Sequence, residues 1–183
     1  MAKHATVVDL EGEKATRERF IGTLEKKSPR FVFLNGHGNE NVVCGHDDEI
    51  LLKESDVAVK DKILYARACK SAKQLGQKAI ENGASAYIGY DEDFIFTTDE
   101  TKSSRPVQDE TAALFLEPSN QTAISILKGH TAEEANRRSK EKFAKNIRTL
   151  LLLGPSEDDY YAIRYLLWDM RHQVCLGDGS SKF

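Results

Sequence analysis

The stretch RFVFLNGHGNENVVCGH, residues 30–46, carries the strand on which the fold prediction depends. Four apolar residues, Phe31–Leu34, are followed at once by Asn-Gly-His-Gly, so that His37 stands between two glycines. A continuous apolar run of this kind is typical of a strand buried on both faces of a parallel sheet. A second stretch, KILYARACKSA at residues 62–72, also starts apolar and then ends in a cysteine, Cys69. The two stretches predict two strands that each end in a reactive side chain.

Strands and helices alternate along the first half of the chain. Stretches rich in apolar and β-branched residues predict strands over residues 4–10 and 84–90, and a small hairpin is expected around residues 45–47. Apolar residues at helical spacing predict helices over residues 13–27 and 70–83. This alternation favours an α/β fold with a mostly parallel central sheet flanked by helices. In such sheets, the loops at the carboxyl ends of the strands carry the chemistry.

The second half of the sequence is mainly helical. The polar stretch 97–108 has no periodicity and predicts a mobile surface loop. Thr131 and Ser156 are suited to cap helices. The helices expected after the loop cover residues 109–116, 120–128, 131–153 and 157–170. The last of them has an apolar group that we expect to pack against the sheet: Tyr160, Tyr161, Ile163, Leu166, Leu167 and Trp168. A short closing strand is expected around Cys175, which should be a core residue.

Composition sets limits on the class of protein. The chain has 183 residues, of which 40% are hydrophobic and 30% charged, and a net charge of −3. These values predict a single globular domain over residues 1–183. Basic and acidic residues are interleaved, so no nucleic-acid partner is indicated. No apolar run approaches the ~20 residues of a membrane span, and three irregularly spaced cysteines fit a reducing compartment. We therefore expect a cytoplasmic protein with no nucleic-acid or membrane partner.

A cysteine and a histidine at two strand ends can act together as nucleophile and base. The cysteine attacks as a thiolate, and the histidine accepts its proton and later protonates the leaving amine. The backbone N–H groups of Gly38 and Cys69 could hold the oxyanion, an interaction worth ~3 kcal/mol. Gly36 and Gly38 are expected to let the backbone turn sharply beside His37 and to let a substrate approach. Cys69 is also expected to precede a helix whose positive end favours a thiolate.

The order of these two motifs resembles that of caspase-like cysteine peptidases. An apolar strand ending in Asn-Gly-His-Gly, followed by one ending in Ala-Arg-Ala-Cys, is similar to the His-Gly and Ala-Cys pair of that clan. The clan includes caspases, gingipains, clostripain, separase and the bacterial CHAT domains. Residues 123–143 (AISILKGHTAEEANRRSKEKF) and 166–181 (LLWDMRHQVCLGDGSS) resemble later segments of gingipain-like and CHAT proteins. The likeness therefore extends from about Arg30 to the end of the sequence.

The resemblance implies a caspase-like three-layer sandwich and a cysteine endopeptidase that acts on protein or peptide substrates. It implies that His37 is the general base and Cys69 the nucleophile, with the Gly38 and Cys69 amides as the oxyanion hole. It requires no third catalytic residue, and the sequence nominates no cofactor and no metal. An unregulated peptidase would harm the cell, so control by a protein partner or by another domain is expected.

The residue preferred before the scissile bond is suggested by an acidic triplet. Several members of the clan that prefer Arg or Lys have an acidic group in the corresponding pocket. In this sequence, three acids follow a predicted core strand: Asp91, Glu92 and Asp93. By this resemblance the triplet predicts cleavage after a basic residue, although three adjacent acids also fit a solvated loop.

The sequence departs from the family in one respect. Only one strand and one helix precede the histidine strand, whereas the sheet of the family usually begins with another strand. Either that strand is missing from the chain, or the chain is the catalytic part of a larger protein. Oligomer or partner contacts could cover the open edge.

Three other interpretations of the same residues stay open. A caspase-like fold can serve as a catalytically inactive binding or regulatory module. Cys69 can be an ordinary buried cysteine, since free cysteine packs as a small hydrophobe. With His37 and Cys69, the residues Cys44 and His46 would complete four ligands of the type that zinc prefers, but their spacing matches no common zinc motif. Cys44 is better explained as a core residue of the hairpin.

Overall fold

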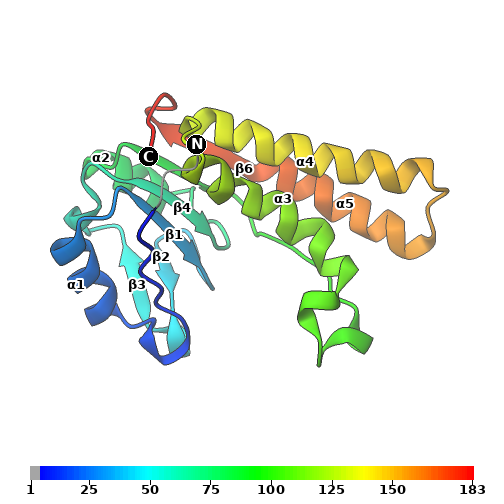
Figure 1. The fold of residues 1–183 in the computed structure, drawn as a ribbon, viewed down its shortest axis with the longest axis horizontal. Helices are drawn as coiled ribbons and strands as arrows, with labels where there is room; N and C mark the ends of the chain where they lie inside the picture. The colour runs from blue at the N-terminus through cyan, green and yellow to red at the C-terminus, as the bar shows by residue number, and fades with distance from the viewer. Residues whose placement is uncertain (1–4) are drawn as a thin grey trace.

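A computed structural model describes residues 5–183, and its centre is a four-stranded sheet (Figure 1). The strands lie side by side in the order β1 (Phe31–Asn35), β4 (Ile63–Arg67), β5 (Ala86–Tyr90) and β6 (Gln173–Gly177). The first three are parallel, and β6 runs antiparallel to β5. A separate antiparallel hairpin follows β1 and consists of β2 (Val42–Cys44) and β3 (Ile50–Lys53). The predicted α/β fold, the mostly parallel sheet and the hairpin are confirmed.

One face of the sheet is covered by α1 (Arg17–Lys27), α2 (Leu75–Glu81) and the hairpin. Phe20 of α1 and Leu52 of the hairpin belong to the same buried cluster as Leu64 of β4. The opposite face is covered by α3 (Glu110–Leu127) and α4 (Ala132–Leu152). The sheet is thus flanked by helices on both faces, an arrangement compatible with a three-layer sandwich (Figure 1).

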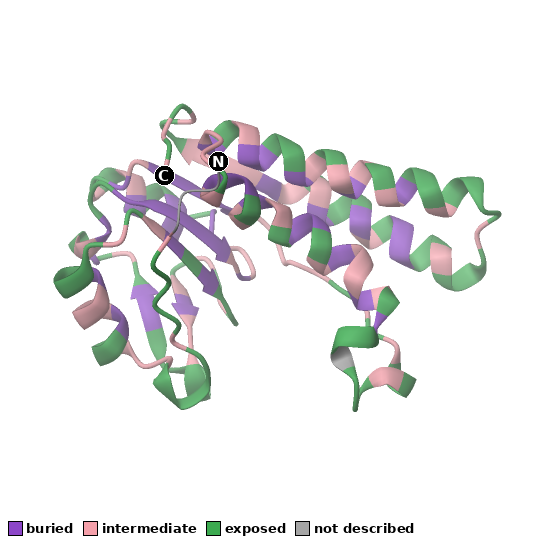
Figure 2. Ribbon diagram, in the orientation of Figure 1, coloured by how far each residue is buried: buried purple, intermediate pink, exposed green. Residues whose placement is uncertain are grey.

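The helices α3, α4 and α5 (Glu157–His172) continue beyond the sheet as a bundle (Figure 1). Ala162, Ile163 and Leu166 of α5 are buried against Phe115 of α3 and Phe143 of α4. The prediction that the apolar group of α5 packs against the sheet is therefore wrong, because these residues complete a separate helical core. The remaining members of that group are exposed: Tyr160, Tyr161, Leu167 and Trp168. Figure 2 shows buried and exposed stretches alternating along the helices of this bundle.

Both predicted helix starts are confirmed. Thr131 and Ser156 each form a capping box with the acidic residue three positions later. The two helices predicted over residues 109–116 and 120–128 are instead one helix, α3, which runs through Pro118. Pro118 has no N–H to donate to the carbonyl oxygen of Leu114 four residues earlier. Asn146 of α4 donates to that carbonyl at 2.8 Å instead, so the helix continues past the proline without an unpaired carbonyl there.

Several loops differ from the prediction. Residues 5–10 form no strand, and residue 4 of that predicted strand lies outside the described residues. The helix predicted over residues 70–83 begins only at Leu75. The predicted loop 97–108 contains two short 3-10 helices, η4 (Glu100–Lys102) and η5 (Pro106–Gln108). Three more 3-10 helices lie elsewhere in the described residues: η1 (Gly12–Lys14), η2 (His46–Asp48) and η3 (Val57–Val59). Within residues 5–183, no helix combines the length and apolar character needed to cross a membrane.

Strand β1 lies at the edge of the sheet, with β4 as its only neighbour in the described chain. Val32 and Leu34 point to the α1 side and are buried, whereas Phe33 on the other face is 39% exposed. The prediction that this strand is buried on both faces is therefore wrong for the face on which Phe33 lies. The Phe33 ring instead stacks on the ring of Tyr65, with 4.9 Å between centroids.

A buried polar network joins the sheet to α3 and α4. The Tyr65 hydroxyl lies 2.6 Å from Ser119 Oγ. Gln173, the first residue of β6, is completely buried, and its Oε1 accepts hydrogen bonds from Tyr90 at 3.1 Å and from Ser139 at 2.8 Å. Its Nε2 donates to Asn136 at 3.0 Å. Because each of these buried groups has a partner, the network fixes how the layers fit together.

Candidate active site

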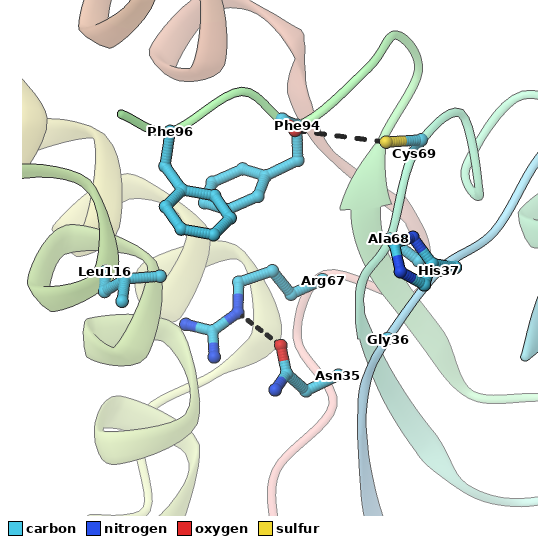
Figure 3. A pocket seen from close by; sticks show the side chains of 9 residues that line it. All are labelled: Asn35, Gly36, His37, Arg67, Ala68, Cys69, Phe94, Phe96 and Leu116. Carbon is cyan, nitrogen blue, oxygen red and sulfur yellow. Dashed lines mark hydrogen bonds between the residues drawn. The ribbon is translucent and has the colours of Figure 1, made fainter. Parts of the chain in front are cut away.

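A pocket of about 420 Å³ lies at the carboxyl ends of β1 and β4 (Figure 3). Its lining comes from the two strand ends, from the chain after β5 and from α3: Asn35, Gly36, His37, Arg67, Ala68, Cys69, Phe94, Phe96 and Leu116. This is the edge of the sheet at which the sequence predicted the chemistry.

His37 and Cys69 are brought to the same pocket by the register of the sheet. Asn35 of β1 pairs with Arg67 of β4, and each reactive residue follows two positions later. Both side chains line the pocket. No hydrogen bond joins His37 to Cys69 among the interactions of residues 5–183.

The Cys69 thiol points toward the chain that follows β5 (Figure 3). It donates a hydrogen bond to the carbonyl oxygen of Phe94 at 3.9 Å. Burial raises the pKa of this thiol above its ordinary value, and the negative charge of Asp93 raises it further. The predicted support from a helix is absent, because α2 begins six positions later and residues 69–74 form turns. The raised pKa favours the neutral thiol over the thiolate.

The glycines beside His37 are required for a reason other than the one predicted. Neither Gly36 nor Gly38 has a positive φ. A Cβ at Gly36 would overlap the carbonyl oxygen of Cys44, and one at Gly38 would lie 2.9 Å from the carbonyl oxygen of Val42. The Cys44 N–H also donates to the His37 carbonyl at 2.8 Å. The hairpin thus lies directly against this loop and holds the backbone of His37 in place.

The predicted oxyanion donors have free N–H groups. Within the described chain, neither the Gly38 N–H nor the Cys69 N–H donates a hydrogen bond. Their backbones are close, because a Cβ at Gly38 would lie 3.5 Å from the carbonyl oxygen of Cys69. Unpaired backbone donors are suited to an oxygen that becomes negative during reaction. Of these two residues, Cys69 lines the pocket and Gly38 does not.

The acidic triplet does not line the pocket. The Asp91 carboxylate lies 2.7 Å from Nδ1 of His172, and Asp93 forms an ion pair with Lys70 at 3.6 Å. The backbone carbonyl of Glu92 accepts a hydrogen bond from the Lys70 N–H. The geometry therefore gives no support to a pocket lined by these acids.

Helix α5 anchors the segment that bears Phe94. Trp168 Nε1 donates to the carbonyl oxygen of Asp93 at 2.9 Å, and the Ile95 N–H donates to Oδ1 of Asp169 at 3.0 Å. Asp169 is fully buried, and its Oδ2 has no hydrogen-bond partner. This burial raises the pKa of Asp169 to about 8. No sequence pattern predicts this anchor, because α5 and residues 93–95 are distant in the chain.

Arg67 is the charged residue of the pocket that sequence reasoning missed. Ile63 and Tyr65 alternate with buried residues of the other face, so the period of β4 places Arg67 on the α3 side. Its Nε donates to Oδ1 of Asn35 at 2.8 Å, and its Nη1 donates to Oδ1 of Asn120 at 2.8 Å. The alternation of β4 could have predicted the side on which Arg67 lies.

The zinc interpretation gains no support from the fold. Across residues 5–183, no three His, Cys, Asp or Glu side chains are grouped so that they could hold a metal ion. Cys44 is half-buried in β2, and burial raises the pKa of its thiol. Cys175 of β6 packs against the core on the α3 side. All three cysteines are free thiols.

Comparison of the chain with known protein families, with curated proteins and with solved structures finds no match.

Proposed function

We propose that this protein is a cysteine endopeptidase with a caspase-like fold, in which Cys69 is the nucleophile and His37 the general base. One observation carries the proposal: two parallel neighbouring strands place His37 and Cys69 in the same pocket. The free N–H groups of Gly38 and Cys69 add the donors that a tetrahedral intermediate needs. We do not extend the proposal to cleavage after a basic residue, because Arg67 lines the pocket and the acids do not.

The chemistry begins with the release of the thiol from Phe94. His37 then takes the thiol proton, and the sulfur attacks the substrate carbonyl carbon to form the Cys69–carbon bond. The oxygen that becomes negative accepts hydrogen bonds from the Gly38 and Cys69 N–H groups. His37 returns the proton to the leaving amine as the peptide bond breaks. Water, activated by His37, hydrolyses the thioester and restores the thiol.

A neutral resting thiol fits a peptidase that is kept inactive until needed. The hydrogen bond to Phe94 and the burial of Cys69 both belong to the resting state. A regulatory protein or another domain that moved the Phe94 segment would free the thiol. Three free cysteines fit the reducing environment of the cytoplasm, where we propose that the protein acts.

A second candidate is a catalytically inactive caspase-like fold that serves as a binding or regulatory module. The observation that favours it is the same thiol contact, since Cys69 bonds to Phe94 and has a raised pKa. The two candidates differ in the reactivity of Cys69. A nucleophile reacts selectively with mechanism-based probes, whereas a structural thiol does not.

The test is labelling by peptidyl acyloxymethylketones, followed by peptide mass mapping. Probes with Asp, Asn or Lys at the leading position are applied to the wild type, Cys69→Ala and His37→Ala. Cys44→Ala and His46→Ala are matched controls, because both residues lie on the hairpin and outside the pocket. We expect labelling at Cys69 that the controls retain and that His37→Ala slows by about 10² or more. No labelling of Cys69 by any probe, in the wild type or in a Trp168→Phe variant that lacks the bond from α5 to the Phe94 segment, would favour the binding module.

A further inference from the structure

The outer edge of β1 carries backbone groups that no part of the described chain pairs. At the start of the ladder, the Arg30 carbonyl accepts a hydrogen bond from the Ile63 N–H. At its end, the Gly36 N–H donates to the Arg67 carbonyl. This parallel pattern turns the backbone groups of every second residue toward β4 and those of the residues between them outward. The outward residues are Phe31, Phe33 and Asn35, and within residues 5–183 their N–H and carbonyl groups have no hydrogen-bond partner.

This edge has none of the features that keep exposed strands apart. Natural sheets protect an open edge with charged side chains, prolines or bulges. The sequence of β1 is Phe-Val-Phe-Leu-Asn, with no charge and no proline, and its pairing with β4 has no bulge. Phe33, at the centre, is 39% exposed even though its ring stacks on Tyr65. An apolar edge of this kind is a template for another strand.

The outward groups are arranged symmetrically about Phe33. In an antiparallel pair of β1 strands from two copies, Phe33 faces Phe33, and Phe31 of each copy faces Asn35 of the other. All of these are hydrogen-bonded positions, and each pair exchanges two bonds, so about six bonds join the strands. Arg30 faces Gly36 of the other copy, so the two positive charges are not opposed.

We infer that two copies of this chain pair through β1, antiparallel and centred on Phe33, so that their two four-stranded sheets become one continuous sheet. A second copy fits this edge because the edge complements itself in hydrogen bonding, in aromatic contact and in charge. The two Phe33 rings lie on the same face of the joined sheet, where each covers apolar surface of the other. The inference goes beyond the proposed function and does not rest on it, because the pairing needs no chemistry.

The association should be weak, because a single pair of short strands is a small interface. We expect a dissociation constant in the micromolar range or above. Sedimentation velocity of the wild type, from low micromolar to near-millimolar concentration, should show the average mass rising from 20.5 kDa toward twice that value. A single-chain mass at every concentration would overturn the inference.

Amide hydrogen exchange at the same concentrations identifies the edge. The N–H groups of Phe31, Phe33 and Asn35 should exchange more slowly as the protein concentration rises. Those of Val32 and Leu34 point to β4 and should be protected equally at every concentration. A dimer formed through side chains alone would not distinguish neighbouring amides in this alternating way. Concentration-dependent protection at β6, the other edge of the sheet, or none at β1 would contradict the pairing.

Two matched substitutions test the contact at the centre of the pair. Phe33→Lys places two positive charges opposite each other and should weaken dimerisation by about tenfold or more. Ile50→Lys is the control, because Ile50 lies in β3 and is also 39% exposed. It should leave the dissociation constant unchanged, whereas equal weakening by both variants would show that Phe33 has no special place in the dimer.

Thermal unfolding in dilute solution checks that both variants fold, since Phe33 also packs on Tyr65. If Phe33→Lys does not fold, the exchange pattern of the wild type decides the question by itself.

Discussion

The thiol of Cys69 is hydrogen-bonded to the carbonyl oxygen of Phe94 across the pocket, at a sulfur–oxygen distance of 3.9 Å. His37 lines the same pocket but has no bond to this thiol. In the resting protein the thiol that we propose as the nucleophile is thus held by the backbone of the segment after β5.

The first prediction concerns the pKa of the Cys69 thiol. Burial and the charge of Asp93 raise this pKa, so the thiolate forms only at a higher pH than in an ordinary cysteine. Alkylation by iodoacetamide, mapped to Cys69 across a pH series, should have a midpoint above that of the same cysteine in the unfolded chain. A midpoint below the unfolded value would mean that a thiolate–imidazolium pair already exists at rest.

The second prediction is a loss of stability with rising pH that originates in Asp169. Its folded pKa of about 8 lies above the ordinary value of 3.8, so the folded state binds a proton that the unfolded state has released. The free energy of unfolding should therefore fall as pH rises from about 4 to about 8. Asp169→Asn should remove this slope and be more stable than the wild type near pH 8. Thermal unfolding of the wild type and of Asp169→Asn across this pH range measures how the stability of each protein depends on pH.

A matching slope in the wild type and Asp169→Asn would contradict the assignment. The variant keeps an acceptor for the Ile95 N–H, so the anchor of the segment should survive the substitution.

The third prediction tests the anchor formed by α5. Trp168→Phe removes the hydrogen bond to the Asp93 carbonyl and should destabilise the protein by ~1 kcal/mol. It should also speed hydrogen exchange of the Ile95 amide, which the same helix holds. Tyr161→Phe is the control, because Tyr161 is an exposed aromatic residue of α5. Unchanged exchange at Ile95 in Trp168→Phe would show that the segment needs no support from this side chain.

The fourth prediction compares two glycines. Gly36→Ala would force the new methyl group against the Cys44 carbonyl oxygen and should cost about 1–3 kcal/mol of stability. Gly22→Ala lies in α1 with open space around it, and should stabilise the protein by about 0.5–1 kcal/mol. Chemical denaturation of the two variants gives both values. If the two substitutions changed the free energy of unfolding equally, the hairpin could move away from β1 at little cost.

Local pattern was enough to predict most of the sheet and the helix starts. The strands β1, β4 and β5 could be predicted from the composition of their apolar runs alone. The starts of α4 and α5 could be predicted from Thr131 and Ser156, because the hydrogen bonds of a helix cap are local in sequence. The positions of His37 and Cys69 at strand ends followed from the same runs.

Features that depend on distant contacts were beyond that reasoning. Asn146 of α4 bonds the Leu114 carbonyl that Pro118 leaves free in α3, and α5 anchors residues 93–95. The pocket wall combines Arg67 with Leu116, which lie 49 positions apart and meet only because α3 crosses the sheet end. Sequence periodicity identifies the face of a strand but not the helix that covers it.

The place of β6 in the sheet has a consequence for synthesis on the ribosome. Its residues 173–177 emerge after every other strand, yet they pair with β5 and supply Gln173 to the buried network. Until then, β5 keeps an open edge and Tyr90 lacks its bond to Gln173. An open strand edge exposes unpaired backbone groups to other chains. The nascent protein is therefore most exposed to misassociation in the interval between the release of α4 and the docking of β6.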